Sequence, residues 1–360
     1  PSLTPDQIRN ALKLSVDSVG ETSLEARRRL GAGRLNLERA LQVAQVFAQG
    51  SSHAKEREDR PTSGSLIVSQ SRGADSIVRR VDGRGNVLAQ FQAYPSGFLG
   101  GVRLATGDVD GDGEVEIVTG TGSSGGPQVR VFDLDGNLEN QFFAFDEGNR
   151  DGIFVSAGDV NGDGADEILV TAAQNGTGQV RIFNRYGHLK GAYFPFGRTS
   201  APVRVALGNI DEDGEEEIFS VLGGAGNGTV LVHDGSGRYV RSFVVLDNAV
   251  DMLSVTTGDI DNDGKVEIIV GSGDGYSPRV SVYNTSGKEQ FSFFGYQLGF
   301  RGGVEVGVGD MDGNGLSEIY VFPYSGGGPQ VRIFSHEGNL IGGFFAFDTS
   351  SRFGGSISIQ

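Results

Sequence analysis

The sequence predicts a mainly β protein, a six-bladed β-propeller with four strands in each blade, preceded by a short two-helix segment. Three observations lead to this prediction. An acidic loop occurs five times, at intervals of 50 or 51 residues. Four short runs of alternating polarity follow one another in each interval, and the two ends of the repeat region complete each other. Four strands repeated with this period are typical of propeller blades.

The acidic loop has the same pattern of Gly, acidic and amide residues in all five copies. Its first copy, residues 107–113, reads GDVDGDG. The other copies begin at Gly158, Gly208, Gly258 and Gly309 and read GDVNGDG, GNIDEDG, GDIDNDG and GDMDGNG. After two intervening residues, every copy continues with Glu and Ile. Matched motifs at matched intervals indicate one structural unit used five times.

The sequence of each interval predicts four antiparallel strands. In the first, residues 101–106 precede the acidic loop and residues 116–119 follow it. After a glycine-rich turn come residues 127–132, and a turn at 135–136 leads to the aromatic run 141–145. Period-two alternation, β-branched and aromatic residues, and Gly, Asn and Asp at the turns all favour strands. No helical period is present from residue 61 onward.

The ends of the repeat region predict how the ring closes. Residues 65–68, 76–81 and 90–94 match the second, third and fourth strands of a repeat, whereas residues 353–360 match only the first. A C-terminal strand that joins three N-terminal strands would leave no exposed sheet edge. Residues 64–360 span about six intervals, so we expect six blades, the last closed in a 3+1 arrangement.

The composition excludes several classes of site. The 360 residues include no Cys, which removes disulfides, thiolate catalysis and Cys-ligated zinc, and the four His have no metal-ligand spacing. No apolar stretch approaches the ~20 residues of a membrane-spanning helix. The net charge of −16 argues against nucleic acid or an anionic membrane as partner, because both attract basic surfaces. It favours cations instead.

The spacing of acidic residues in the loop predicts a calcium site. In the first copy, Asp108, Asp110 and Asp112 stand at positions 1, 3 and 5, Gly113 at position 6 and Glu116 at position 9. Alternate residues of a tight loop point inward, and a cage of oxygens suits Ca²⁺ better than Mg²⁺, which requires stricter octahedral geometry. The loop is not an EF-hand, because it closes at nine residues between strands.

Three of the other four loops replace one Asp by Asn (Asn161, Asn209 and Asn314) and the remaining loop keeps all three Asp residues, so the predicted cofactor is about five Ca²⁺ ions. These ions would change the net charge from −16 to −6. The alternative is that the loops are ordinary Asp/Gly turns, but five copies in register with Glu at position 9 argue against it. The predicted ligands are Asp108, Asp110, Asp112, Glu116, Asp159, Asn161, Asp163, Glu167, Asn209, Asp211, Asp213, Glu217, Asp259, Asp261, Asp263, Glu267, Asp310, Asp312, Asn314 and Glu318.

These repeats resemble FG-GAP repeats, the calcium-binding blades of integrin alpha-subunit propellers and of many bacterial secreted proteins. The resemblance rests on the loops, the period, the stretches 98–101 (FLGG) and 300–303 (FRGG), and the Gly-Gly-Pro turns at 125–127 and 327–329. It departs in having FxGG for a strict Phe-Gly and six expected blades where integrins have seven. It implies a Ca²⁺-stabilised platform whose structural metals lie opposite the usual ligand surface.

The first sixty residues predict a different kind of segment. Residues 4–7 (TPDQ) form a capping-box-like start for a helix over 5–16, and Asn36 can cap a second helix with its buried stripe in 37–44. Residues 49–63 are polar and predict a linker. An unrelated helical hairpin is the simple alternative. The sequence begins at Pro1, with neither a Met nor a signal segment in it, so we expect a processed product or a fragment.

Residues 2–48 also resemble the C-terminal end of subtilisin-like serine protease (subtilase) domains. The similar pieces are 3–12 (LTPDQIRNAL), 31–36 (GAGRLN) and 40–41, in the order helix, strand, helix. The resemblance implies that 1–48 is the end of a catalytic domain whose Asp, His and Gly-Thr-Ser segments lie upstream. The chain has no Gly-Thr-Ser, so no catalytic residue is predicted in it.

Three functions follow from these resemblances. The first is the accessory C-terminal region of a secreted subtilisin-like endopeptidase, partnered by the upstream protease domain. The second is a stand-alone extracellular, adhesin-like module for a protein or glycan. The third, a hydrolase with a site in the central channel, is disfavoured because Arg103, Arg204 and Glu305 stand singly on the first strands, with Phe154 and Leu253 in similar places, so no constellation is expected. The first two place the protein outside the cell or at its surface.

Overall fold

The computed structural model describes residues 16–17, 34–35, 64–211, 213–223, 228–245 and 254–359. The predicted second helix and the linker at 49–63 lie outside these residues, as does the predicted first helix, except that its last residue, Val16, begins strand β1. Strand β1 (Val16–Asp17) pairs antiparallel with β2 (Arg34–Leu35). In the described part of the chain, no helix is long and apolar enough to cross a membrane.

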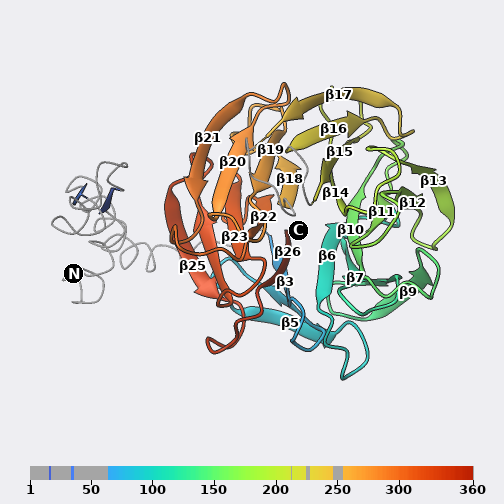
Figure 1. Ribbon diagram of the computed structural model, residues 1–360, viewed down its shortest axis with the longest axis horizontal. Coiled ribbons are helices and arrows are strands. Elements are labelled where there is room, and N and C mark those ends of the chain that lie inside the picture. The colour runs from blue at the N-terminus through green and yellow to red at the C-terminus, as the bar shows by residue number, and fades with distance from the viewer. Residues whose placement is uncertain are drawn as a thin grey trace. The chain divides into compact units, whose positions relative to one another are not determined.

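Six four-stranded antiparallel sheets surround a central axis and form the propeller (Figure 1). We number blades 1 to 5 by their acidic loops and call the sixth the closing blade. Blade 1 contains β6 (Val102–Gly107), β7 (Glu116–Thr121), β8 (Gln128–Phe132) and β9 (Leu138–Phe143). Blade 2 contains β10 (Ile153–Gly158), β11 (Glu167–Ala172), β12 (Val180–Phe183) and β13 (Leu189–Tyr193). The predicted six-bladed fold is confirmed.

The remaining blades repeat this order. Blade 3 contains β14 (Val203–Gly208), β15 (Glu217–Leu222), β16 (Thr229–His233) and β17 (Tyr239–Val244). Blade 4 contains β18 (Ser254–Gly258), β19 (Glu267–Gly271), β20 (Arg279–Tyr283) and β21 (Glu289–Phe294). Blade 5 contains β22 (Val304–Gly309), β23 (Glu318–Pro323), β24 (Gln330–Phe334) and β25 (Leu340–Phe345).

The closing blade joins the two ends of the repeat region as predicted. It contains β26 (Gly355–Ile359), β3 (Leu66–Gln70), β4 (Ile77–Val81) and β5 (Val87–Gln92), in that order. The β26–β3 ladder runs from Gly355 opposite Gln70 to Ile359 opposite Leu66. A strand from the far end of the sequence therefore occupies the innermost place of this blade.

Burial follows the position of a strand within its blade. The second strands are buried over their whole length, as in β7 and β11, or over all but their last residue, as in β3 and β15, because a blade packs on both of their faces. The outermost strands alternate between exposed and half-buried residues, as in β9. The fourth strand of blade 1 was predicted at 141–145, but β9 extends from Leu138 to Phe143. Its start was missed because its first two residues are exposed and belong to no apolar run.

The FxGG stretches place a backbone against the loop between the second and third strands. A Cβ atom added at Gly302 would lie 1.8 Å from the carbonyl oxygen of Ser325, whereas one added at Gly299 would meet nothing within 4 Å. We expect Gly302→Ala to lower the free energy of unfolding by about 2–4 kcal/mol, because a backbone must move. Gly299→Ala, the control, is expected to stay within about 0.5 kcal/mol. Equal denaturation midpoints would contradict this.

Candidate metal sites and the central channel

The five acidic loops lie at one end of the propeller. Each loop connects the innermost strand of its blade to the second strand, as residues 108–115 connect β6 to β7. The innermost strands of all blades run in the same direction along the axis, so the loops that follow them share one face. The loops between second and third strands, and those between blades, lie at the opposite face.

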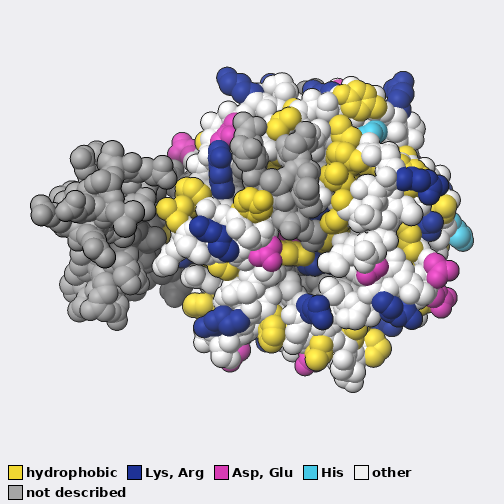
Figure 2. All heavy atoms as spheres, viewed as in Figure 1, with side chains coloured by type: hydrophobic (Ala, Val, Ile, Leu, Met, Phe, Trp, Pro, Cys, Tyr) yellow, Lys and Arg dark blue, Asp and Glu magenta, His cyan; other side chains and the backbone are white. Residues whose placement is uncertain are grey.

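On the face drawn in Figure 2, Lys and Arg side chains are spread around the propeller without forming one patch.

Hydrogen bonds inside each loop hold the carboxylates in place. The carboxylate of Asp108 accepts the backbone N–H groups of Gly111 (2.8 Å) and Gly113 (2.9 Å). The carboxylate of Asp112 accepts the N–H of Glu114 (2.8 Å). The same bonds recur in blade 5, where Asp310 accepts from Gly313 and Gly315. The position 1 and position 5 side chains are therefore oriented by the backbone.

In four loops, three carboxylates converge so that one oxygen of each lies within 4.8 Å of the others. Oxygen atoms at this separation fit the 2.3–2.6 Å ligand distances of Ca²⁺ around a common centre. The converging groups are Asp108, Asp110 and Glu116; Asp211, Asp213 and Glu217; Asp259, Asp261 and Asp263; and Asp310, Asp312 and Glu318. The donor set thus fits a hard divalent cation.

The second loop is arranged differently. Asp159, Asp163 and Glu167 form no such three-carboxylate group among the described residues. Asn161 stands at position 3, and its Nδ2 donates to Glu167 Oε1 at 2.5 Å. Two other predicted carboxylate ligands, Asp112 and Glu267, also lie outside the converging groups of their own loops, and the predicted amide ligands Asn209 and Asn314 belong to none of these carboxylate groups.

The position 9 glutamates are buried and anchor the start of the loop. Glu116, Glu217 and Glu318 each accept the backbone N–H of the position 2 residue, at 3.0, 3.0 and 3.2 Å. Burial raises the pKa of Glu116 to about 7, with further increases from neighbouring carboxylates. Burial likewise raises the pKa of Glu318 to about 7, and Asp312 adds to the increase. A cation placed among these oxygens would favour their ionised form.

Without a bound cation, the propeller is expected to lose stability as the pH rises from about 4.5 to about 7. The folded pKa of Glu116, Glu167, Glu267 and Glu318 is about 7, above the ordinary value of 4.5, so the folded state binds more protons in this window. The stability that these four protonated glutamic acids contribute is fully present below pH 4.5 and is lost as the pH rises through 7. Melting in chelator at pH 5 and pH 8 measures it; a higher melting temperature at pH 8 would contradict the prediction.

Two half-buried acidic residues that the sequence reasoning missed, Asp166 and Glu216, link neighbouring loops through their backbone. The N–H of Asp166 donates to Asp108 O, and that of Glu216 to Asp159 O, both at 2.8 Å. Burial raises the pKa of Asp166 to about 6 and that of Glu216 to about 7, and in both cases neighbouring carboxylates add to the increase. Both residues stand at position 8 of their loops, where an acidic residue occurs in only two of the five copies.

Arg185 is a second feature that the sequence reasoning missed. It lies in the turn between β12 and β13 and forms ion pairs with Asp110 and with Glu139, the latter at 3.0 Å. The guanidinium group therefore compensates part of the negative charge of the first loop. Residues 75 apart in sequence gave no signal of this contact.

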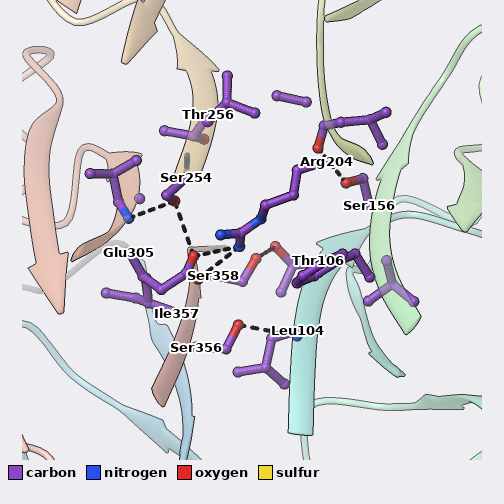
Figure 3. Close-up of a pocket in the computed structure, with 18 of the residues that line it drawn as sticks. Leu104, Thr106, Ser156, Arg204, Ser254, Thr256, Glu305, Ser356, Ile357 and Ser358 are labelled. Atoms are coloured by element: carbon purple, nitrogen blue, oxygen red, sulfur yellow. Dashed lines mark hydrogen bonds and ion pairs between the residues drawn. The ribbon is translucent and has the colours of Figure 1, made fainter. Parts of the chain in front are cut away.

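The central channel corrects a prediction. The residue four positions before the leading glycine of each acidic loop is equivalent in blades 1 to 5. These residues are Arg103, Phe154, Arg204, Ser254 and Glu305. Blade 4 therefore contributes Ser254 and not the expected Leu253, which lies outside the described residues. Arg204 Nη2 donates to both Oε atoms of Glu305 at 2.7 Å, and Ser254 Oγ donates to Glu305 Oε2 at 3.0 Å (Figure 3). The expectation that these side chains stand singly is wrong, because closure of the ring brings blades 3, 4 and 5 together.

Comparisons with known proteins agree with this architecture. The FG-GAP-like repeat family matches residues 209–270 and 259–321, and the FG-GAP repeat family matches residues 152–183. A search of curated protein sequences found no match. These ranges include four of the five acidic loops.

Solved structures show the fold alone. A protein of unknown function from Bacteroides caccae is 13% identical, has a TM-score of 0.51, and the match covers 82% of this chain and 99% of that one. Virginiamycin B lyase from Staphylococcus aureus is 13% identical over 78% of this chain and 84% of its own, with a TM-score of 0.49. The V. cholerae biofilm matrix protein Bap1 is 16% identical over 84% of this chain and 58% of its own, with a TM-score of 0.38. The family matches show that residues 152–183 and 209–321 are similar to FG-GAP repeats, and the sheet topology shows that these residues belong to a six-bladed propeller.

Proposed function

We propose that the chain is a calcium-binding FG-GAP propeller that forms the accessory C-terminal region of a secreted subtilisin-like serine endopeptidase. The observation that carries the calcium part is the convergence of three carboxylates in each of four loops, those of blades 1, 3, 4 and 5. FG-GAP repeats often bind calcium, which agrees with this donor set. The chain itself is non-catalytic in this proposal, because it contains no Gly-Thr-Ser nucleophile segment.

The loop residues would hold the ion by direct coordination. Aspartates at positions 1, 3 and 5 supply carboxylate oxygens, and the glutamate at position 9 supplies another while fixing the position 2 backbone. The bound ion would supply a charge that neutralises these oxygens. Because each loop joins the innermost strand to the second strand, and position 8 residues link neighbouring loops, the ions would fasten adjacent blades at one face.

Calcium titration of the chelator-treated protein tests this proposal. We expect about five bound ions by isothermal titration calorimetry. Asp263→Ala removes the position 5 ligand of blade 4 and is expected to lower the number by one, leaving the other loops loaded. Asp135→Ala, which removes an exposed aspartate in the turn between β8 and β9, is the control and should not change it. A stoichiometry near zero, or the same stoichiometry for Asp263→Ala, would contradict the site.

The protease part rests on the subtilase-like residues 2–48. Within the segment for which that resemblance implies a strand, β2 occupies Arg34–Leu35 and pairs with β1. Reading the coding sequence upstream of Pro1 tests this part. Segments with Asp, His and a Gly-Thr-Ser nucleophile behind an export signal would support it, whereas an export signal or a start codon immediately before Pro1 would contradict it.

A stand-alone, adhesin-like module for a protein or glycan is the second candidate. The loops at the face opposite the acidic loops expose the apolar side chains of Leu99, Leu298 and Phe353, at 50%, 50% and 40% of their surface. Exposed apolar side chains are typical anchors for partners. Binding of the propeller to an extracellular matrix or glycan array, abolished by Leu298→Ser but unaffected by Asp263→Ala, would favour this candidate over the first.

A further inference from the structure

The central channel contains a cavity of about 240 Å³ that the acidic loops do not share. The innermost strands of all six blades line it, and its charged lining residues are Arg103, Arg204 and Glu305. These three lie in the first half of their strands, toward the face opposite the acidic loops. The cavity is therefore separate from the candidate calcium sites along the axis.

The cavity lining has two guanidinium groups and one carboxylate, and only Arg204 is paired with that carboxylate. Arg204 uses Nη2 for both oxygens of Glu305, which is itself almost completely buried. Arg103 donates from Nη2 to the hydroxyl of Tyr324 at 3.0 Å, a neutral acceptor. Because the lining residues offer one negative charge for two positive charges, the described part of the channel carries a net charge of +1.

Aromatic rings hold both guanidinium groups in the channel. Arg103 lies over the rings of Phe154 and Tyr324, at 5.1 and 5.0 Å from their centroids. Arg204 lies over Phe154 at 4.7 Å. The ring of Phe154 therefore has both guanidinium groups over it, and the cation–π contacts fix where the charges stand.

Several N–H groups of these arginines are buried without an acceptor. Nε and Nη1 of Arg103 and Nη1 of Arg204 are inaccessible and have no hydrogen-bond partner among the described residues. A guanidinium group is always charged and has five donors, so leaving buried N–H groups unpaired is costly. Planar oxyanions are the acceptors that such groups bind best. These inaccessible N–H groups lie among the aromatic rings, so it is the excess positive charge of the lining that favours an oxyanion in the cavity.

We propose that the channel binds a small oxyanion, a carboxylate, sulfate or phosphate group, between Arg103 and Arg204. The volume corresponds to roughly eight waters at ~30 Å³ each, which accommodates one such group with a few waters but not a polymer chain. The group could be a free ion or the acidic end of a larger ligand that enters from the face opposite the acidic loops. Arg103 supplies the uncompensated charge, and Glu305 limits how strongly the anion is held.

Anion titration of the calcium-loaded full chain tests the proposal. Sulfate and acetate are titrated at constant ionic strength against chloride, with calorimetry and melting temperature as readouts. We expect saturable binding and a rise in melting temperature. Arg103→Gln should weaken binding at least about tenfold, as expected when a charge-assisted hydrogen bond is lost. Arg84→Gln, which removes an exposed arginine in the turn between β4 and β5, is the matched control and should bind as wild type.

A second variant tests the charge balance with the opposite sign. Glu305→Gln keeps side-chain shape but raises the channel charge from +1 to +2, so it should bind the anion more tightly than wild type. This gain distinguishes an anion site from a general loss of folding in a variant. Tighter binding of acetate than of sulfate would identify carboxylate-bearing ligands as the source, and the reverse order would identify inorganic oxyanions.

Three outcomes would overturn the proposal. Wild type could bind neither anion, Arg103→Gln could bind as well as Arg84→Gln, or Glu305→Gln could bind more weakly. None of these outcomes bears on calcium stoichiometry, so the failure of this proposal and that of the proposed function are distinguishable.

Discussion

Chelation of calcium is expected to lower the melting temperature of the propeller by more than about 10 °C. Each ion bound only by the folded state at a hundredfold excess over its Kd adds ~2.7 kcal/mol to the free energy of unfolding. About five such ions would add roughly 13 kcal/mol, and one kcal/mol shifts the melting temperature of a large domain by about 2–4 °C. Scanning calorimetry of the same sample in calcium and in chelator measures the shift.

The physical reason is the repulsion that remains when the ions leave. In the first loop, Asp108, Asp110 and Glu116 hold their oxygens within 4.8 Å of one another. Burial and neighbouring carboxylates raise the pKa of Glu116 to about 7, so at pH 8 the loop without calcium carries all three charges, which the Arg185 guanidinium offsets only in part. The calcium-dependent difference in melting temperature should therefore be larger at pH 8 than at pH 5.

A control separates the specific sites from general ionic effects. Magnesium at the same concentration should restore less stability than calcium, because it demands tighter octahedral geometry. The Asp263→Ala variant should show a smaller calcium-dependent shift than wild type, and Asp135→Ala an equal one. If chelation leaves the melting temperature of wild type unchanged, the acidic loops are turns and the calcium proposal fails.

Arg185 allows a finer comparison between loops. Its guanidinium group pairs with Asp110, so it competes with a cation for that carboxylate in the first loop. We expect Arg185→Gln to raise calcium affinity at one site by several-fold, since one competing charge is removed. Calorimetric titration of the wild type and the variant measures it. An unchanged or lower affinity at every site would show that this ion pair does not oppose binding.

The fold was predictable because each blade repeats local chemistry. Alternating polarity, glycine turns and the acidic loop all lie within about 50 residues, so the sequence contains the strand order of every blade. Closure was predictable because residues 353–360 supply a first strand and nothing else. The fourth strand was misplaced because exposed residues such as Leu138 begin it without an apolar run.

The channel was not predictable because it depends on contacts between different blades. Arg204 and Glu305 are 101 residues apart, and each looks isolated on its own strand. Ring closure places their strands around one axis, where a guanidinium group and a carboxylate meet. Similarly, Asp166 and Glu216 link neighbouring loops because each donates its backbone N–H to a carbonyl oxygen of the loop in the preceding blade. Sequence reasoning thus found the ligands within a loop and missed the partners between blades.

Removal of the closing strand is the second change with a large expected effect. Deletion of residues 353–360 removes β26, whose five residues pair with β3. Leu66, Ile67 and Val68 of β3 are completely buried in the intact ring and would lie at a sheet edge. We expect aggregation, or a melting temperature lowered by more than about 10 °C, since an unpaired apolar edge is prone to association and several buried side chains lose their cover.

Closing-strand contacts extend beyond its own blade. Ser356 Oγ accepts the N–H of Leu104 at 3.3 Å, and the hydroxyls of Thr106 and Ser358 lie 2.9 Å apart, so β26 also joins blade 1 along the channel. A peptide of residues 349–360 added in trans should therefore restore part of the melting temperature, whereas a scrambled peptide should not. A truncated protein that stays monomeric and melts as wild type would show that the ring is held by its other interfaces, and that closure by β26 contributes little to its stability.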